Sequence, residues 1–141
     1  MAMTIHVDVV SAEGEIFSGT AEEVYIPAEM GEIGVMPRHT PLVSRLKPGE
    51  VRVKPQGSGE MQSIFVSGGM VEVQPHVVTV LADTGIRAHD LDEAKALEAK
   101  QRAEDAMAKQ EDSIDYAKAK AELIEATAQL AMLKKIRKNL R

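Results

Sequence analysis

Apolar and polar residues alternate over residues 1 to about 85 of the chain. The alternation is clear from Ile5 to Val9 and recurs in three later segments. A period of two residues is typical of a β-strand with one buried face. Turns that contain glycine or proline separate these segments at intervals of roughly 8–12 residues, which favours an antiparallel sandwich or barrel. The residues predicted to face its core are Ile5, Val7, Val9, Val24, Ile26, Val51, Val53, Val71 and Val73.

One predicted strand, residues 76–83, is apolar on both faces. Val78 and Val80 lie on one side of this strand, and Val77 and Leu81 lie on the other. A strand with two apolar faces needs cover on both sides. The second cover is either the later part of this chain or another protein.

After residue 85 the pattern changes to that of helices. No glycine or proline occurs from residue 90 onward, and strong helix formers such as Ala, Glu, Lys and Leu dominate. We predict one helix over 91–108 and a second over 114–138, joined by a short link. The predicted N-cap of the first helix is Asp90, and Glu93 completes a capping box with it. The predicted N-cap of the second helix is Asp112 or Ser113.

The short link between the helices predicts an antiparallel hairpin. The expected fold class is therefore α+β, with an N-terminal antiparallel β-sandwich over 1–85 and a C-terminal antiparallel two-helix hairpin over 86–141. Alanine dominates the expected contact between the helices, and burying a methyl group contributes only about 0.8 kcal/mol, against about 1.5–3 for leucine. Either the hairpin is permanently docked, or its weak packing makes it a two-state element. The contact residues we expect are Ala94, Leu97, Ala99, Ala103, Ala106 and Met107 in the first helix and Ala117, Ala121, Ile124, Ala128, Leu130 and Ala131 in the second.

Composition excludes several classes of function. The chain has no cysteine, which excludes disulfides and thiol nucleophiles, and its two Phe, two Tyr and no Trp leave few stacking platforms for single-stranded nucleic acid. It has no phosphate-binding glycine loop, no nucleophile elbow and no metal-spaced histidines, so we expect neither an enzyme nor a metal site. No signal peptide is evident, and no apolar run approaches the roughly 18 residues of a membrane span, so we expect a cytoplasmic protein.

Charge is distributed unevenly along the chain. Residues 1–85 carry five basic and eleven acidic groups, which gives −6, and residues 86–141 carry twelve basic and eleven acidic groups, which gives +1. The basic excess lies at the C-terminus, in Lys134, Lys135, Arg137, Lys138 and Arg141. A nucleic-acid-binding role for this tail conflicts with the net charge of −5 and the few aromatic residues.

The segment "GEIGVMPRHTPLVSRLKPGE", residues 31–50, combines three glycines and three prolines with regularly spaced apolar residues. It is too broken for a helix and too apolar for a disordered linker. Proline fixes φ and so lowers the entropy lost when a segment docks. We interpret the segment as a stiff, kinked loop, which either turns the corners of the sandwich or forms a docking site.

Four stretches occur in an order that resembles the epsilon subunit of bacterial F-type ATP synthase. They are "SAEGEIFSG" (11–19), "GEIGVMPRHTPLVSRLKPG" (31–49), "SGGMVEVQPHVVTVLAD" (67–83) and "DLDEAKALEAKQRAE" (90–104). The resemblance spans essentially the whole chain. It implies a non-catalytic subunit of the central rotor stalk, which couples proton flow through the c-ring to ATP synthesis and restrains ATP hydrolysis through its helices. It also implies a peripheral location on the cytoplasmic face of the bacterial inner membrane.

The resemblance assigns partners to particular residues. The c-ring contact that it implies comprises Met30, Gly31, Glu32, Ile33 and His39. Contact with the gamma subunit through the sandwich would use the doubly apolar strand, at Val77, Val78, Val80 and Leu81. The inhibitory helix would carry its positive charges, Lys134, Lys135, Arg137, Lys138 and Arg141, to the beta and alpha subunits of the catalytic head.

The resemblance also suggests a nucleotide site at the start of the first helix. Some members of the family bind ATP at a motif of the form Ile/Leu-Asp-x-x-Arg-Ala. The matching residues are Leu91, Asp92, Lys95 and Ala96, with Arg102 as a further cation. Lysine lacks the planar fork with which arginine holds two phosphate oxygens. We therefore expect no required cofactor and at most weak regulatory binding of ATP, and the same residues also suit a simple helix cap.

The main alternative is a stand-alone nucleotide-sensing or binding module, for which the sandwich is only a scaffold. Binding to an isolated gamma subunit separates this alternative from the rotor subunit.

Overall fold

The computed structural model describes residues 3–109 and 113–139. The chain divides into two compact units, Met1–His89 and Asp90–Arg141. The division falls four residues after the expected position, because β9 (Gly85–Arg87) still pairs with the sandwich strand β6.

The first unit contains nine strands among the described residues. β1 is parallel to β8 and antiparallel to β2, and all the other strand pairs are antiparallel. The remaining strands besides β9 are β1 (Ile5–Ser11), β2 (Gly14–Ala28), β3 (Gly31–Val35), β4 (Leu42–Leu46), β5 (Gly49–Pro55), β6 (Gln62–Val66), β7 (Gly69–Val73) and β8 (Val77–Ala82).

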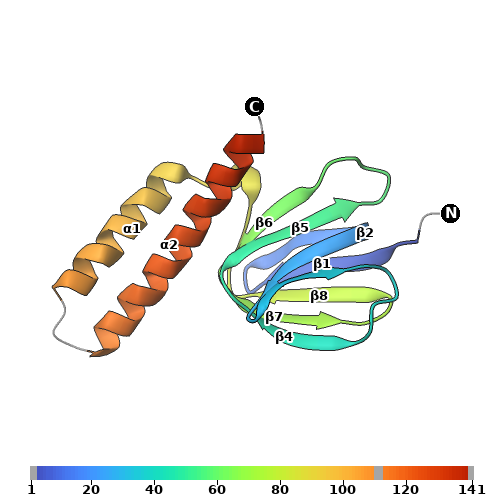
Figure 1. The fold of residues 1–141 in the computed structure, drawn as a ribbon, viewed down its shortest axis with the longest axis horizontal. Helices are drawn as coiled ribbons and strands as arrows, with labels where there is room; N and C mark the ends of the chain where they lie inside the picture. The colour runs from blue at the N-terminus through green and yellow to red at the C-terminus, as the bar shows by residue number, and fades with distance from the viewer. Residues whose placement is uncertain (1–2, 110–112, 140–141) are drawn as a thin grey trace. The chain divides into compact units, whose positions relative to one another are not determined.

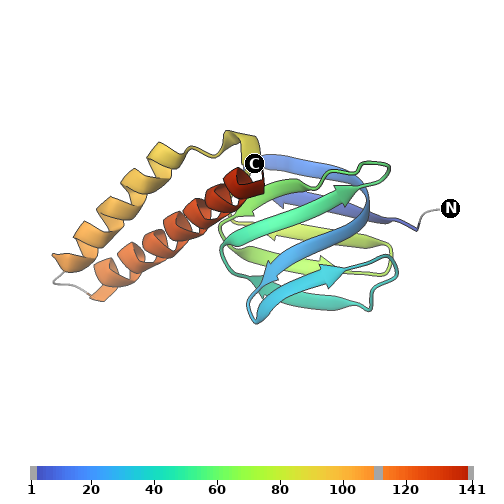
Figure 2. The same cartoon turned by 45° about the horizontal axis from the view of Figure 1, so that its top comes forward.

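The long strand β2 connects the two layers of the sandwich (Figures 1 and 2). Its first half pairs with β1, whereas its second half pairs with β3 and β5. The register shifts between Ala21 and Glu23, and such a bulge bends a strand and increases its twist. One layer is therefore β1–β8–β7–β4, and the other is formed by β3, the second half of β2, β5, β6 and β9.

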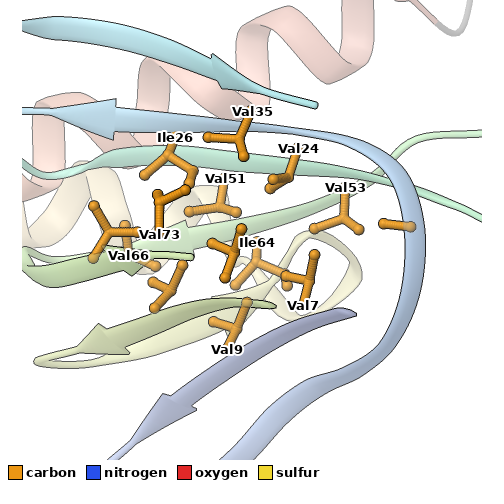
Figure 3. Packing of buried hydrophobic residues seen from close by; sticks show 14 of the residues in the cluster. Val7, Val9, Val24, Ile26, Val35, Val51, Val53, Ile64, Val66 and Val73 are labelled. Atoms are coloured by element: carbon orange, nitrogen blue, oxygen red, sulfur yellow. The ribbon is translucent and has the colours of Figure 1, made fainter. Parts of the chain in front are cut away.

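The predicted core positions are confirmed. All nine residues expected to face inward are at most 1% exposed, and Val35, Ile64 and Val66 complete the aliphatic centre (Figure 3). At Gly69 the φ angle is +131°, and a Cβ there would lie 2.0 Å from the carbonyl oxygen of Leu81. The backbones of β7 and β8 therefore approach closely only because this position is glycine.

The structure corrects the interpretation of residues 31–50. These residues form two strands, β3 and β4, with a connection at 36–41, and they reach into β5 at Gly49. The backbone N–H of Arg38, a residue with φ of +66°, donates to the carbonyl of Pro75 at 2.9 Å. The glycines and prolines thus punctuate short strands rather than build one long loop.

The second unit is a pair of helices that run antiparallel, α1 (Glu93–Ala108) and α2 (Ser113–Asn139) (Figure 1). The predicted cap Asp90 is wrong, because Asp90 ends a short 3₁₀ helix, Ala88–Asp90, and α1 begins after Asp92. The Asp92 carboxylate accepts hydrogen bonds from the N–H groups of Ala94 (2.9 Å) and Lys95 (3.2 Å). The predicted cap Asp112 lies outside the described residues.

The predicted contact between the helices is mostly wrong. Ala103 is buried as expected, but Leu97 and Ile124 are 51% and 48% exposed, so they lie away from the contact. The buried alanines of each helix are seven residues apart, and this spacing returns to the same side of a helix. The buried positions are Ala96 and Ala103 in α1 and Ala119, Ala126 and Met132 in α2.

Candidate functional site

The strand β8 is apolar on both sides, as predicted, but its two sides have different environments. Val78 and Val80 are fully buried in the sandwich core, so the expectation that they contact a partner is wrong. Val77 is half-buried and Leu81 is 55% exposed, and both lie on the opposite side of the strand. Of the four predicted gamma contacts, only these two have side chains that another protein can reach.

Leu81 lies in a row of side chains across three strands. Its register partners are Val10 on β1 and Met70 on β7. Met70 is 39% exposed, and Val43, on the neighbouring strand β4, is 65% exposed. We call the outward side of β1, β8, β7 and β4 the outer face. Val10, Met70 and Val43 were not among the predicted contacts, although each is an apolar residue at an outward position of its strand.

A polar network lies on the same outer face. The Ser18 hydroxyl donates to Asp8 Oδ1 at 2.7 Å, and His6 Nε2 lies 2.9 Å from the same oxygen. The hydrogen bond from Ser18, assisted by His6, lowers the pKa of the Asp8 carboxyl, although burial opposes this shift. The serine is bonded directly to the carboxylate, so this trio lacks the serine–histidine–aspartate order of a nucleophilic triad. The network links side chains of the paired strands β1 and β2.

The expected c-ring residues lie on and beside the hairpin between β2 and β3. Ala28 pairs with Gly31, so Glu29 and Met30 form a two-residue tip, and Met30 is 97% exposed. Gly31 has a φ of +134°, which favours glycine after such a tight turn. Ile33 packs against the core instead of projecting into solvent.

Glu32 is held by other residues of the sandwich. The Arg52 guanidinium donates to the Glu32 carboxylate at 2.5 Å and stacks over the Tyr25 ring at 4.7 Å. Half of the Glu32 side chain remains exposed. His39 lies outside the hairpin, in the connection between β3 and β4, where its Nδ1 is 2.6 Å from the Thr40 carbonyl oxygen.

The start of α1 has the contacts of a helix cap. The Asp92 carboxylate accepts both cap hydrogen bonds at Oδ1, so one of its oxygens is used by the cap, and Ala96 is only 2% exposed. Lys95 is exposed, and Leu91 is half-buried. These residues therefore do not form a closed phosphate site in the described structure.

Arg102 lies in a groove between α1 and α2, away from the helix start. A cavity of about 280 Å³ is lined there by Ala99, Arg102, Glu122, Glu125, Ala126 and Gln129. Burial, reinforced by the charge of Glu122, raises the pKa of the Glu125 carboxyl. Two carboxylates beside one guanidinium disfavour a phosphate group in this groove.

The basic tail belongs to the last turns of α2, where Lys134, Lys135, Arg137 and Lys138 are exposed. Arg141 lies outside the described residues. Arg137 forms an ion pair with Glu93, the first residue of α1. This contact joins the two ends of the hairpin, and sequence spacing offered no signal for it because 44 positions separate the partners.

Two features are absent from the described residues. No group of three or more histidine, cysteine or acidic side chains is arranged to hold a metal ion. No helix in the described part of the chain is both long and apolar enough to cross a membrane.

Comparisons with known proteins give consistent matches over the whole chain. The beta-sandwich domain model of the ATP synthase delta/epsilon chain matches residues 4–88, and the corresponding long alpha-helix domain model matches residues 89–134. The ATP synthase epsilon chain of Nitrosococcus oceani is 64% identical over 140 residues, which cover 99% of both chains. That of Thioalkalivibrio sulfidiphilus is 62% identical over 141 residues, which cover both chains completely.

Solved structures share the fold at much lower identity. A chain of the Euglena gracilis mitochondrial ATP synthase superposes with a TM-score of 0.71 at 21% identity, over 98% of this chain and 82% of that one. A chain of the central stalk and c-ring structure of the Tetrahymena thermophila mitochondrial ATP synthase gives 0.62 at 12% identity, over 94% and 95%. Both family models and full-length relatives agree, and the chain therefore belongs to the epsilon-chain family of F-type ATP synthase, a family of non-catalytic subunits.

Proposed function

We propose that this chain is a rotor subunit of the central stalk, which couples proton flow through the c-ring to ATP synthesis and restrains ATP hydrolysis. The observation that carries the proposal is the pairing of two different units in one chain. An acidic sandwich presents an apolar outer face, and a weakly packed hairpin ends in a cluster of cations. The first unit suits permanent docking, and the second suits a reversible contact.

The gamma subunit is the partner we assign to the outer face. Leu81, Met70 and Val43 are exposed apolar side chains on one face of the sandwich, and a gathered apolar surface is typical of a protein contact. Asp8 and Glu72 lie in the next row, because Asp8 pairs with Thr79 and Thr79 pairs with Glu72. Val43 ends that row beside Glu72, and Arg45 continues the row of Leu81 and Met70. A complementary gamma surface is therefore apolar opposite Leu81 and Met70 and basic opposite the neighbouring acidic row.

The c-ring is the partner we assign to the hairpin tip. Met30 projects without cover, and the two-residue turn with its paired strands makes the tip stiff. A stiff contact loses little entropy on docking and transmits torque with little deformation. Glu32 supports the tip through Arg52 and keeps half of its side chain exposed for the polar loops of the ring.

The hairpin is the regulatory element of the proposal. Its buried centre is mainly alanine, and burial of methyl groups stabilises docking by only about 0.8 kcal/mol each. α2 has 27 residues, which is about 40 Å at 1.5 Å per residue, so an undocked α2 reaches far from the sandwich. Its terminal cations would then meet acidic segments of the beta and alpha subunits. ATP is at most a weak ligand, because the helix start is self-capped and the central groove is acidic.

As part of such a complex, the chain would lie peripherally at the cytoplasmic face of the bacterial inner membrane. It would require no cofactor of its own.

Truncation after Met132 tests the inhibitory part of this proposal. Adding the truncated chain back to a head-and-gamma complex that lacks it should restore assembly but give faster ATP hydrolysis than the full-length chain. Inhibition by the full-length chain should weaken as salt rises, because the screening length falls from about 10 Å at 0.1 M to about 3 Å at 1 M. Equal hydrolysis rates with the two chains at low and at high salt would rule out the tail as a brake.

A further inference from the structure

The ion pair between Arg137 and Glu93 closes the open end of the hairpin. Glu93 is the first residue of α1, next to the cap Asp92, and Arg137 lies in the last turn of α2. The middle of the hairpin has the same antiparallel register, because the groove there is lined by Arg102 from α1 and Glu125 from α2. The pair is thus part of the regular docking of the helices, at its free edge.

Each partner is also suited to the end of its own helix. A carboxylate is favourable at the positive N-terminus of α1, and a guanidinium is favourable at the negative C-terminus of α2. Antiparallel packing brings these two ends together, so the side chains meet where both dipoles already favour them. The Arg137 and Glu93 side chains are 61% and 45% exposed, so water and salt reach the pair and either partner can exchange.

We propose that Glu93 is an intramolecular competitor for Arg137, which withholds one cation of the tail while the hairpin is docked. This inference rests on the proposed function of the tail as a brake. Pairing with Glu93 holds Arg137 at the start of α1, so this contact is lost when α2 undocks and carries Arg137 to the catalytic head. Release of the tail therefore includes the loss of this pair, and the strength of the pair sets part of the balance between docked and released chains.

A weak contact matters here because the rest of the docking is weak. The buried centre is mostly alanine, and Glu125 is a carboxylate whose charged form is disfavoured by burial and by Glu122. Exposed ion pairs change an equilibrium by roughly 1.5- to 5-fold. In an equilibrium near balance, that factor moves the released fraction from about one half to roughly 0.6–0.8, and where released chains are the minority it changes their population by a comparable factor.

We call the ion pair between Glu93 and Arg137 the latch. A double-mutant cycle on the isolated full-length chain tests it directly. The chain has no cysteine, so Leu97→Cys and Lys134→Cys, both at exposed positions, introduce a pair of fluorescent labels across the hairpin. Glu93→Gln should lower the ratio of docked to released molecules by roughly 1.5- to 5-fold, but should have little effect when Arg137→Gln is already present. The exposed Glu104→Gln, elsewhere on α1, is the matched control and should leave the ratio unchanged.

The functional arm uses the reconstituted complex. Glu93→Gln should strengthen inhibition of ATP hydrolysis by a similar factor in the full-length chain and have no effect in the chain truncated after Met132. Additive effects of Glu93→Gln and Arg137→Gln on docking would overturn the latch. The other outcome is that Glu93→Gln and Arg137→Gln are coupled in the docking measurement, while ATP hydrolysis responds neither to Glu93→Gln nor to the truncation. That outcome would support the latch and overturn the proposed brake.

Discussion

Substituting Leu81 by alanine should weaken binding of the gamma subunit. Leu81 is 55% exposed, and complete burial of a leucine contributes about 1.5–3 kcal/mol. If gamma covers the exposed part of Leu81, this burial contributes about 0.8–1.6 kcal/mol to binding. Replacing Leu81 by alanine removes most of that contribution. Since 1.4 kcal/mol is a factor of ten, Leu81→Ala should raise the Kd for gamma by roughly 4- to 15-fold.

The assay is calorimetric titration of the full-length chain with isolated gamma. Leu97→Ala is the matched control, because Leu97 is 51% exposed but belongs to the helical unit. It should change the Kd by less than about twofold. Circular dichroism must show that both variants remain folded, which is expected because neither side chain is in a core. An unchanged affinity for Leu81→Ala, or equal losses for the two variants, would refute the assignment of gamma to the outer face.

Three further predictions concern the other proposed sites. Glu32→Cys should form a disulfide under oxidising conditions with a cysteine in the polar loop of the c subunit, and no cross-link beside a working positive control would contradict the assignment of the hairpin. ATP should bind the isolated chain only with a Kd near the millimolar range, about −4.1 kcal/mol; calorimetry should show tighter binding for Lys95→Arg, whereas a micromolar Kd for the unaltered chain would be inconsistent with the self-capped helix. The pKa of Glu125 is raised in the folded chain, so its contribution to docking is present at low pH and is lost as pH rises through that folded value. Glu125→Gln should therefore raise the melting temperature of the hairpin near neutral pH and flatten its pH dependence above about 4.5, and identical melting curves from about pH 4 to 8 would disprove this.

The sandwich was largely predictable from local patterns. Side chains of a strand alternate strictly between two faces, so Val7, Val24 and Val53 could be assigned to the core without knowing which strands pair. The same rule separated Val78 from Leu81, but alternation alone does not say which of two apolar sides is inside. That choice depends on the neighbouring strands β1 and β7, and it removed Val78 and Val80 from the expected gamma contact.

The positions of the helices along the chain were predictable, but the side of each helix that is buried was not. Alanine at so many positions gives no preferred apolar side, so the hydrophobic pattern could not say that Ala96 and Ala126 are inside while Leu97 and Ile124 are exposed. Only the packing of one helix on the other selects that side, because close approach requires small residues along the line of contact. The N-cap shifted for a related reason, since Asp90 and Asp92 are chemically equivalent caps and the path of the chain out of β9 decided between them.

Contacts between distant residues came from the tertiary structure alone. Three such contacts are Glu93 with Arg137, Glu32 with Arg52, and Asp8 with Ser18, and their partners are selected by strand register and helix packing. The sequence by itself determined two units, an aliphatic sandwich core and a basic C-terminal end, because these follow from local periodicity and composition. The folded chain decided which apolar residues remain exposed and which charges are already paired, because both depend on neighbours that are remote along the chain.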